Sequence, residues 1–344
     1  MRRVLFITTK NLDYIRNVQE IQYLREDSRN EVDVIGLMSK VYVFRILYVW
    51  LRLLFTRFRR YEIVFAGFAP QLFLPIYSKR IKRAGCRIAE DFFISLYDTF
   101  CLDRKKFGID SMMGNILHRL DEKTLKCADR IICDTKEHGK FFVDEFEADP
   151  SKIKVSYIKA DKSIYYTGVA GSESDIRQKV FEELFPDVSY DKNKTIVLYF
   201  GTGLPLQGTD VVLDAMNEIM EDRLYTCVFV GHLKGNSLSK LSEGAGILHR
   251  DWLSQHDLAR LIDISDICLA GHFNHRIDKA LRTIPGKAFI YEAMDKPMIL
   301  GDNPANREYF KESNRAGFVK MGDSHALAQG IRDLAVSATL NKSL

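Results

Sequence analysis

Three cations gather around one predicted helix start in the second half of the chain. Pro285 suits the first turn of a helix, because the amide it lacks would have no partner within the helix. The free amides of such a turn, with the helix dipole behind them, favour an anion. Lys287 lies in this turn, and Lys279 and Arg282 come just before it. The cluster therefore predicts a diphosphate site; the alternative is a solvated basic loop.

A second candidate phosphate site is the glycine-rich turn GTGLPLQG, residues 201–208, which follows the apolar run Thr195–Phe200. A helix is predicted directly after it, over Thr209–Met220. Because they lack side chains, Gly201 and Gly203 would let backbone amides approach a phosphate or a sugar closely. An ordinary turn between a strand and a helix is the alternative.

The order of these motifs resembles that in glycosyltransferases of family 4, in the branch that carries K-A-x-R-x-I-P-x-K before a helix. The resemblance runs from about Lys123 to Ile331, and Asp295 stands where the branch usually has Gly before Lys-Pro. It implies an α/β protein with the GT-B fold, two Rossmann-like domains facing a cleft. It also implies transfer of a sugar from a nucleotide-sugar donor, UDP- or GDP-linked, with retention at the anomeric carbon and without a metal or other cofactor.

The resemblance implies roles for residues of the second domain. Lys287 and Arg282 would act in catalysis by stabilising the charge that grows on the leaving diphosphate, with Lys279 and Pro285 beside them. Where many relatives carry Arg and Lys to hold the diphosphate, this chain has Thr202 and Gln207.

The remaining donor candidates come from two later segments. The nucleotide base is expected beside the loop that contains His249 and Trp252, although a lone Trp can instead belong to the core. Relatives often hold the donor with two Glu residues eight positions apart, and this chain has Arg282 and Ile290 at those positions. Glu292 is therefore the candidate for the ribose, with a surface carboxylate as the alternative.

Candidates for the acceptor side lie in the first half of the chain. The resemblance places the loop after the first strand, with Thr9, Lys10 and Asn11, at the acceptor site. Asp91 ends a predicted strand and Asp98 follows on the connection, so both are catalytic candidates for orienting or deprotonating an acceptor hydroxyl. A helix cap is the alternative for Asp98. Retaining transfer can also proceed with the leaving phosphate helping to deprotonate the acceptor.

Alternating strand and helix patterns must position these residues. Val4–Thr8, a helix from about Ile15, and Glu31–Leu37 form the β-α-β opening of a doubly wound sheet, without the G-x-G-x-x-G of dinucleotide-binding folds. A fresh alternation begins at Thr195. We therefore predict an acceptor domain over residues 1–165, a linker over 166–194, a donor domain over 195–330, and a tail over 331–344 that could pack back on the first domain.

The segment Lys40–Arg60 is apolar and aromatic and contains no acidic residue. Three arginines recur in it every seven residues, which predicts one basic stripe along a helix over about 41–60. A spanning helix is disfavoured, since each Arg near the bilayer centre costs about 2.5–3.5 kcal/mol. A helix lying in the membrane surface fits the pattern, and a buried helix with arginine stems reaching solvent is the alternative. The basic stretch Lys79–Arg87 is a candidate for the same face. The membrane candidates are Arg45, Trp50, Arg52, Arg59 and Arg60.

Composition limits the class of protein. The 344 residues are 46% hydrophobic, which suits one large or two medium domains, and a net charge of +4 is too small to indicate nucleic-acid binding. Six scattered cysteines indicate reduced thiols in a cytosolic protein, and no metal-ligand spacing appears in the sequence. The start, MRRVLFITT, leads straight into a strand and lacks a signal-peptide cleavage site.

These observations predict a cytoplasmic protein, peripheral at the inner face of the cell membrane. The expected partners are the nucleotide-sugar, a lipid-linked saccharide acceptor in surface polysaccharide synthesis, and an anionic membrane surface. Two other functions stay open. A non-catalytic GT-B protein that binds a nucleotide-sugar or a partner transferase would explain the missing Glu pair. A nucleotide-sugar epimerase on the same fold would need neither an acceptor nor a membrane helix.

Overall fold

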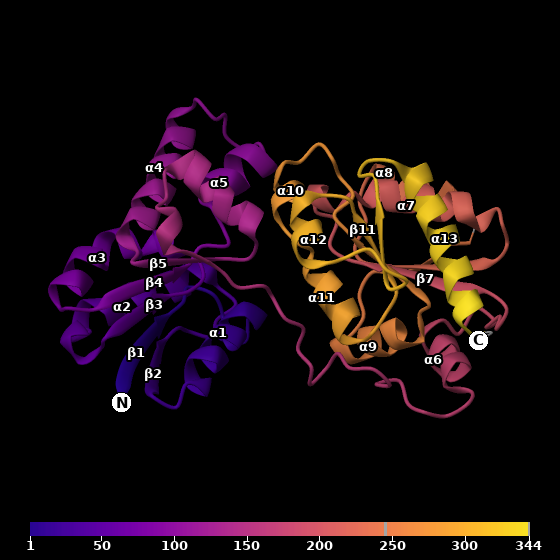
Figure 1. Cartoon of the computed structure of the whole chain (residues 1–344), viewed down its shortest axis with the longest axis horizontal. Helices are drawn as coiled ribbons and strands as arrows, with labels where there is room; N and C mark the ends of the chain where they lie inside the picture. The colour runs from indigo at the N-terminus through magenta and orange to yellow at the C-terminus, as the bar shows by residue number, and fades with distance from the viewer. Residues whose placement is uncertain (244–245, 343–344) are drawn as a thin grey trace. The chain divides into compact units, whose positions relative to one another are not determined.

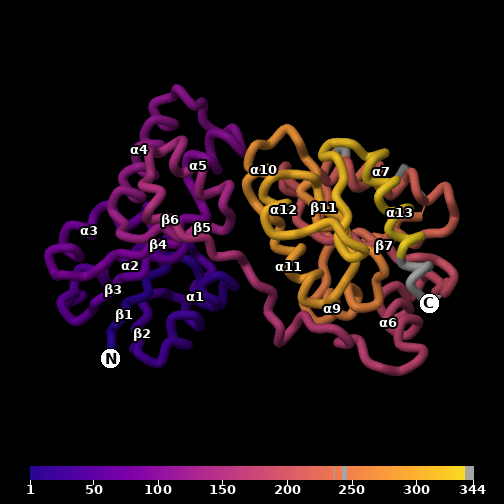
Figure 2. The backbone as a smooth tube through the Cα atoms, viewed as in Figure 1, coloured from indigo at the N-terminus to yellow at the C-terminus, as the bar shows by residue number. Residues whose placement is uncertain are grey.

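The computed structural model describes residues 1–243 and 246–342. The chain divides into two compact units, Met1–Ile158 and Lys159–Leu344 (Figures 1 and 2). Each unit contains a six-stranded sheet whose strands all pair in parallel. This arrangement confirms the predicted α/β class with two Rossmann-like sheets.

The first unit alternates strands and helices from its first residues. Its elements are β1 (Arg2–Ile7), α1 (Ile15–Glu26), β2 (Asn30–Ile35), α2 (Tyr42–Phe55), β3 (Ile63–Ala66), α3 (Leu74–Arg83), β4 (Arg87–Asp91), α4 (Met112–Cys127), β5 (Arg130–Cys133), α5 (Lys136–Phe146) and β6 (Ile153–Val155). The strand order is β2-β1-β3-β4-β5-β6.

Side-chain alternation along β1 decides which helices cover which face of this sheet. Val4 and Phe6 pack with Leu24 of α1 on one face. Leu5 and Ile7 point to the other face, whose core is shared with residues of α2, α3, α4 and α5. The alternation is the two-residue period of a strand that is buried on both faces, as parallel sheets require.

The second unit repeats this plan. Its elements are α6 (Ile176–Leu184), β7 (Thr195–Phe200), α7 (Thr209–Met220), β8 (Tyr225–Val230), α8 (Asn236–Glu243), β9 (Leu248–Arg250), α9 (Gln255–Ile264), β10 (Ile267–Gly271), α10 (Lys279–Arg282), α11 (Gly286–Ala293), β11 (Met298–Gly301), α12 (Pro304–Tyr309), β12 (Ala316–Val319) and α13 (Ser324–Lys342). The strand order is β12-β11-β10-β7-β8-β9. Figure 1 shows α7, α8 and α13 together on one face of this sheet, with α9 and α11 on the other.

The segment predicted as a linker contains a helix that belongs to the second unit. In α6, Val180 and Phe181 are buried, and the helix packs against α9. Arg177 of α6 donates two hydrogen bonds, of 2.9 and 2.6 Å, to the carboxylate of Asp266. The amphipathic piece inside the predicted linker therefore folds onto the second unit, because its apolar face needs a partner.

The tail also carries core residues of the second unit. Ile331 and Leu334 of α13 lie in the hydrophobic cluster formed with α7. Residues 343 and 344, the end of the predicted tail, lie outside the described residues.

Helix α2 differs from its prediction in length and in the side it buries. It ends at Phe55, and Arg59 and Arg60 lie in a separate short turn, η1 (Phe58–Arg60). Arg45, predicted on the exposed basic stripe, is only 7% exposed, and its Nη1 donates to Asn11 Oδ1 at 2.7 Å. The predicted exposure of the basic stripe is therefore wrong at Arg45, because this side chain is buried and hydrogen-bonded to Asn11 from the loop after β1.

The exposed side of α2 is largely apolar, whereas its buried side carries Val49 and Leu53 together with Arg45. None of the helices among the described residues is long and apolar enough to cross a bilayer. The exposed apolar residues of α2 are Val43, Phe44, Leu47, Trp50, Leu51, Leu54 and Phe55.

Candidate functional site

The strand order of the second sheet creates a crevice at the carboxyl end of β7. The connections that leave β7 and β10 run in opposite directions at this point, and ligands of open α/β sheets bind at such a switch. A cavity of about 760 Å³ lies here. It is lined by part of the glycine-rich turn, the first turn of α7, and the loops that follow β8 and β10.

The cavity wall carries groups that suit a phosphorylated ligand. Lys234 and His232 come from the loop after β8, and His275 and Arg276 from the loop after β10. Residues 208–211, where α7 begins and which include the carboxylate of Asp210, line the same space, and Gly208 at its N-cap provides no side-chain cap. Amides of a helix start together with cationic side chains form an anion-binding wall.

Gly208 holds the two main loops of the cavity together. Its φ of +68° lies in the left-handed region, and an added Cβ would lie 2.7 Å from the carbonyl carbon of Phe273. Phe273 donates its amide to the carbonyl of Gln207 at 3.2 Å, and Asn274 Nδ2 donates to the carbonyl of Pro205 at 2.8 Å. Only a residue without a side chain allows this close approach of the two loops.

Lys287 lies beneath the glycine-rich turn and does not line the cavity. It is 6% exposed, and its Nζ donates to Gln207 Oε1 at 3.0 Å and lies 3.8 Å from the centre of the Tyr199 ring. The hydroxyl of Tyr199 donates to the same Oε1 atom at 2.6 Å. Burial lowers the pKa of Lys287 well below its usual value. Gln207, in the place of the relatives' cation, is thus the partner of the buried lysine.

The other predicted cations of this cluster lie apart from the cavity. Lys279 and Arg282 are half-buried in the short helix α10, and neither lines the cavity. Pro285 is the N-cap residue of α11, and Lys287 stands in its first turn, as the sequence predicted. The structure therefore places Lys287 next to Gly201 and Gln207, whereas Lys279 and Arg282 lie in α10, outside the lining of the cavity.

The predicted base and ribose residues have different surroundings. The Nε2 atom of His249 lies 2.9 Å from the carbonyl oxygen of Gly231, at the end of β8. Trp252 is 77% exposed, so the alternative of a core Trp is wrong and its ring is free to stack on a base. Glu292 is exposed on α11 and accepts a hydrogen bond of 3.2 Å from the hydroxyl of Tyr309.

Two of the three predicted acceptor-loop residues support the loop itself. Thr9 is fully buried and donates to the carbonyl of Phe68 at 2.9 Å. Asn11 uses its Oδ1 to accept from Arg45 and from the amide of Ser39. Lys10 is half-exposed, with its ammonium 5.1 Å from the centre of the Phe68 ring. Of the three, Lys10 has the side chain most open to a ligand.

Asp91 is held in a buried ion pair. It is 1% exposed, and its two carboxylate oxygens each accept from Arg16, from Nε and Nη2, at 2.6 Å. Burial opposes the charge on Arg16, but the neighbouring Asp91 more than offsets this and raises the pKa of Arg16. Burial, and then the charge of Asp91, raises the pKa of Glu20, which lies beside the pair. Asp91 therefore fixes the carboxyl end of β4 to α1.

Asp98 is also buried, at the start of a π-helical turn over Asp98–Asp103. Its amide donates to Ser95 Oγ at 2.9 Å, and Ser95 Oγ donates to Asp121 Oδ2 at 2.7 Å. The N-cap position of the turn is Tyr97, so the alternative of a cap at Asp98 is wrong. Neither predicted carboxylate is exposed to solvent.

Sequence reasoning missed the cations that line the cavity. Lys234 and Arg276 each follow a buried strand by a few residues, which was the available signal. Within residues 1–243 and 246–342, no group of three or more His, Cys, Asp or Glu side chains comes together as metal ligands do.

Comparison with solved structures identifies the architecture. HepE of Anabaena, in complex with UDP-glucose, aligns with a TM-score of 0.68 at 14% identity over 98% of this chain and 91% of that one. Sucrose-phosphate synthase from Thermosynechococcus elongatus gives 0.68 at 11% identity, and WaaG, a glycosyltransferase involved in lipopolysaccharide biosynthesis, gives 0.62 at 10%, each with the same coverage. No protein-family model matches the sequence, and no curated protein matches it significantly. The chain therefore has the GT-B fold.

Proposed function

We propose that this protein is a glycosyltransferase that moves a sugar from a nucleotide-sugar to an acceptor. The observation that carries the proposal is the cavity at the switch point of the second sheet. Its wall combines the start of α7 with Lys234 and Arg276, and this wall belongs to a GT-B fold. The negative charge of a diphosphate has to be neutralised, and cationic side chains can do this in place of a metal ion.

Two parts of the donor would find partners at or near the cavity, the diphosphate and the base. The diphosphate would contact Lys234, Arg276 and the amides of residues 208–211. The exposed ring of Trp252 is the candidate to stack on the base. A UDP-linked donor is favoured, because HepE, with the same fold, is described in complex with UDP-glucose.

Lys287 would act on the chemical step from below the glycine-rich turn. Its ammonium is hydrogen-bonded to Gln207 Oε1 and lies next to Gly201, two residues of the glycine-rich turn, most of whose other residues line the cavity. Negative charge that grows on the leaving phosphate would favour the protonated form of this lysine, which burial disfavours in the free protein. A preorganised donor of this kind commonly contributes about 3–4 kcal/mol to the transition state.

The proposed transfer is retaining and independent of metal. In such a reaction the leaving phosphate helps to deprotonate the acceptor hydroxyl, so no separate base is needed. The engagement of Asp91 with Arg16 and the burial of Asp98 accord with this mechanism.

The acceptor we propose is a lipid-linked saccharide at the cytoplasmic face of the membrane. The support is α2, which exposes seven large apolar side chains although its other side is buried. An exposed apolar face of this size marks an interaction site, and a helix lying in the bilayer surface would cover it. WaaG, with the same fold, is described as acting in lipopolysaccharide biosynthesis.

One observation favours a second candidate, a GT-B protein that binds a nucleotide-sugar without turning it over. The ammonium of Lys287 is already hydrogen-bonded to Gln207 and in contact with the Tyr199 ring, and Glu292 is already hydrogen-bonded to Tyr309. The two candidates differ in donor turnover, which only the enzyme would show.

The test is a thermal-shift titration of the whole chain with UDP, GDP, CMP and dTDP and their common sugars, without metal. A nucleotide at a hundred times its Kd stabilises by about 2.7 kcal/mol, which raises Tm by about 5–10 °C for a unit of this size. Lys234→Gln combined with Arg276→Gln should abolish the rise. Lys192→Gln combined with Lys311→Gln, two exposed lysines outside the cavity, should leave it unchanged. Absence of any rise would contradict the donor site, and a rise without donor turnover would favour the second candidate.

A further inference from the structure

One acidic side chain lies in the anion-binding wall of the cavity. Asp210 belongs to the first turn of α7, and among the described residues that line the cavity it alone carries a carboxylate. The same wall contains Lys234 and Arg276, the proposed partners of the diphosphate. A carboxylate beside a diphosphate weakens binding by like-charge repulsion, unless it accepts hydrogen bonds from another part of the ligand.

Asp210 is held in place by the neighbouring helix. Its Oδ1 accepts a hydrogen bond of 2.7 Å from the hydroxyl of Ser237, in the first turn of α8. Among the described residues, the side chain of Asp210 forms no other hydrogen bond or ion pair, and the residue is exposed. Because an ionised carboxylate has about four acceptor positions, most of those of Asp210 stay available to a ligand.

The place of Asp210 in the helix offers a simpler role. A carboxylate in the first turn of a helix is stabilised by the helix dipole, whatever lies in front of it. This role affects the stability of the free protein, whereas a ligand contact affects which nucleotides bind, so the two roles are separable by experiment. The bond to Ser237 and the place in the cavity wall favour the ligand contact, because the dipole requires neither.

The strand order indicates which part of the donor reaches Asp210. In the second sheet β7 lies between β10 and β8, and β9 follows β8 at the edge. The diphosphate site extends from Arg276, after β10, to Lys234, after β8. Asp210 is tied to the β8 side of this site by its bond to α8. Trp252, the candidate for the base, follows β9, one strand further along.

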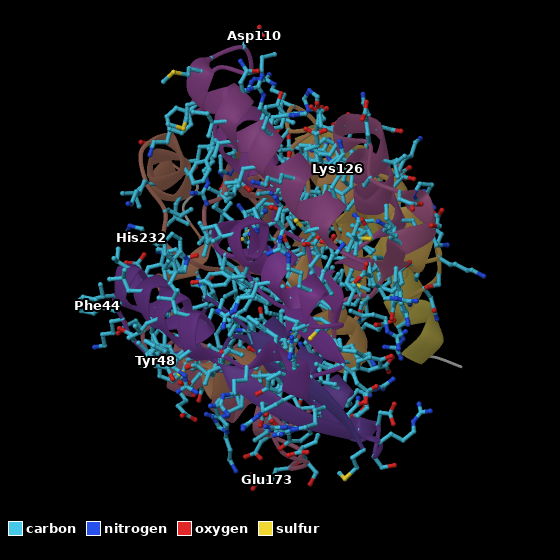
Figure 3. All side chains as sticks on the ribbon, turned by 90° about the vertical axis from the view of Figure 1, so that its left-hand side faces the viewer. Phe44, Tyr48, Asp110, Lys126, Glu173 and His232 are labelled. Atoms are coloured by element: carbon cyan, nitrogen blue, oxygen red, sulfur yellow. The ribbon has the colours of Figure 1, made fainter. Side chains whose placement is uncertain are left out.

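The loop of Trp252 adjoins this side of the cavity. The Nδ1 atom of His232, which lines the cavity after β8, lies 3.6 Å from Oδ1 of Asp251, the residue before Trp252. Figure 3 shows His232 at the surface of the molecule. In a nucleoside diphosphate the ribose is the group between the phosphates and the base. A nucleotide that runs from the diphosphate site toward Trp252 would therefore bring its ribose to Asp210.

We propose that Asp210, positioned by Ser237, binds the two ribose hydroxyls of the nucleotide and makes the cavity selective for ribonucleotides. This inference rests on the donor site of the proposed function and adds the residue that recognises the ribose. A ribose offers two O–H donors to the carboxylate, whereas a 2′-deoxyribose offers only one. Glu292, the ribose candidate from the sequence, is bonded to Tyr309 and does not line the cavity.

The experiment measures Kd of the whole chain for UDP and 2′-deoxy-UDP, and for GDP and 2′-deoxy-GDP, by isothermal titration calorimetry without metal. The quantity compared is the ratio of the Kd of the deoxy form to that of the ribo form. A hydrogen bond to a charged group corresponds to about tenfold to a hundredfold in affinity, so the wild-type ratio should be about ten or more.

Asp210→Ala should bring this ratio to within about twofold of one, because the second hydroxyl then has no charged acceptor. The deoxynucleotide should bind the variant at least as tightly as the wild type, since the repulsion between the carboxylate and the diphosphate is also removed. A variant that had merely lost its fold would bind neither form. Ser237→Ala keeps the carboxylate but not its positioning bond, and should give an intermediate ratio.

Asp214→Ala is the matched control. Asp214 lies one turn further along α7, is also bonded to α8, from Lys240 Nζ at 2.6 Å, and does not line the cavity. This variant should keep the wild-type ratio. An equal fall of the ratio in Asp210→Ala and Asp214→Ala would overturn the assignment, because a disturbed helix α7 would then explain both.

The remaining outcomes separate this inference from the proposed function. Nucleotide binding with a wild-type ratio within about twofold of one would overturn the ribose contact and leave the donor site standing. UDP binding that Mg²⁺ strengthens in the wild type but not in Asp210→Ala would make Asp210 a metal ligand instead. If the wild type bound none of the four nucleotides, the donor site itself would be wrong, and this inference with it.

Discussion

Replacing Lys287 with Met separates the role of this residue in stability from its role in function. The ammonium is buried and has no carboxylate partner among the described residues; its contacts are Gln207 Oε1 and the Tyr199 ring. Met has similar length and no charge, and Gln207 Oε1 keeps the hydrogen bond from Tyr199. Replacing buried ion pairs with apolar residues of similar volume often stabilises by about 1–4 kcal/mol, and we expect a gain of this order for a buried charge that lacks an ionic partner. For a unit of this size, we therefore expect Tm of the ligand-free variant to rise by about 2–16 °C.

The stability gained by Lys287→Met should be larger at low pH than at high pH. Burial places the pKa of folded Lys287 below the unfolded value of 10.5. Between these two values the unfolded chain holds a proton that the folded chain has lost, so the stability of the wild type rises with pH across that window. The Met variant lacks this rise. Its advantage should be largest below the folded pKa and disappear as the pH approaches 10.5.

Activity should change in the opposite direction. Loss of one preorganised donor costs about 10²–10³ in kcat, so donor turnover should fall by that factor although the protein is more stable. Lys296→Met is the matched control, because Lys296 is another largely buried lysine of this unit, bonded to the carbonyl of Asp263. A Lys287→Met protein that melts earlier and keeps turnover within threefold would refute the reasoning and leave Lys287 as a structural hydrogen-bond donor.

Two further substitutions test the cavity and the first sheet. Gly208→Ala should destabilise by more than about 1–2 kcal/mol and remove the nucleotide response, because left-handed strain adds to contact with Phe273; Gly235→Ala, with φ +57° and nothing near its Cβ, should show the strain alone in a thermal scan. Glu90→Gln should raise Tm near neutral pH, because both carboxylate oxygens of Glu90 are buried without a partner among the described residues. Burial, then the charge of Asp121, raises the pKa of Glu90, so wild-type stability is full below 4.5 and falls as pH passes the folded pKa. Equal melting of the Gln variant and the wild type from pH 4 to pH 8 would contradict this.

The sequence was sufficient for the local features of both sheets. The apolar run Val4–Thr8 with the strand-helix-strand order after it, and the fresh alternation from Thr195, indicated two α/β domains, which the strand pairing confirms. The turn with Gly208 and the helix start after Pro285 were also predicted correctly. These features depend on backbone conformation within a few residues, where the chemistry of Gly and Pro is decisive.

Tertiary structure decided which side of each element is covered. The period of α2 shows which residues share a side, but Arg45 is buried because Asn11 meets it from 34 residues away. Asp91 was predicted as an acceptor-side carboxylate, and the structure shows that both of its oxygens are bonded to Arg16, 75 residues away. Periodicity shows which side chains of a helix or strand share a face, but it does not show which distant part of the chain buries that face.

For the candidate site, too, the sequence and the tertiary structure supplied different parts of the answer. The sequence by itself indicated a glycine-rich turn after one strand and a cation at a helix start after another, and the structure shows that these strands, β7 and β10, are neighbours. Only the folded chain decided that Lys287 is buried under Gln207 while Lys234 and Arg276, from two other loops, face the cavity. The reason is physical, since a site at the edge of a parallel sheet is assembled from loops whose spacing in the chain carries no record of their separation in space.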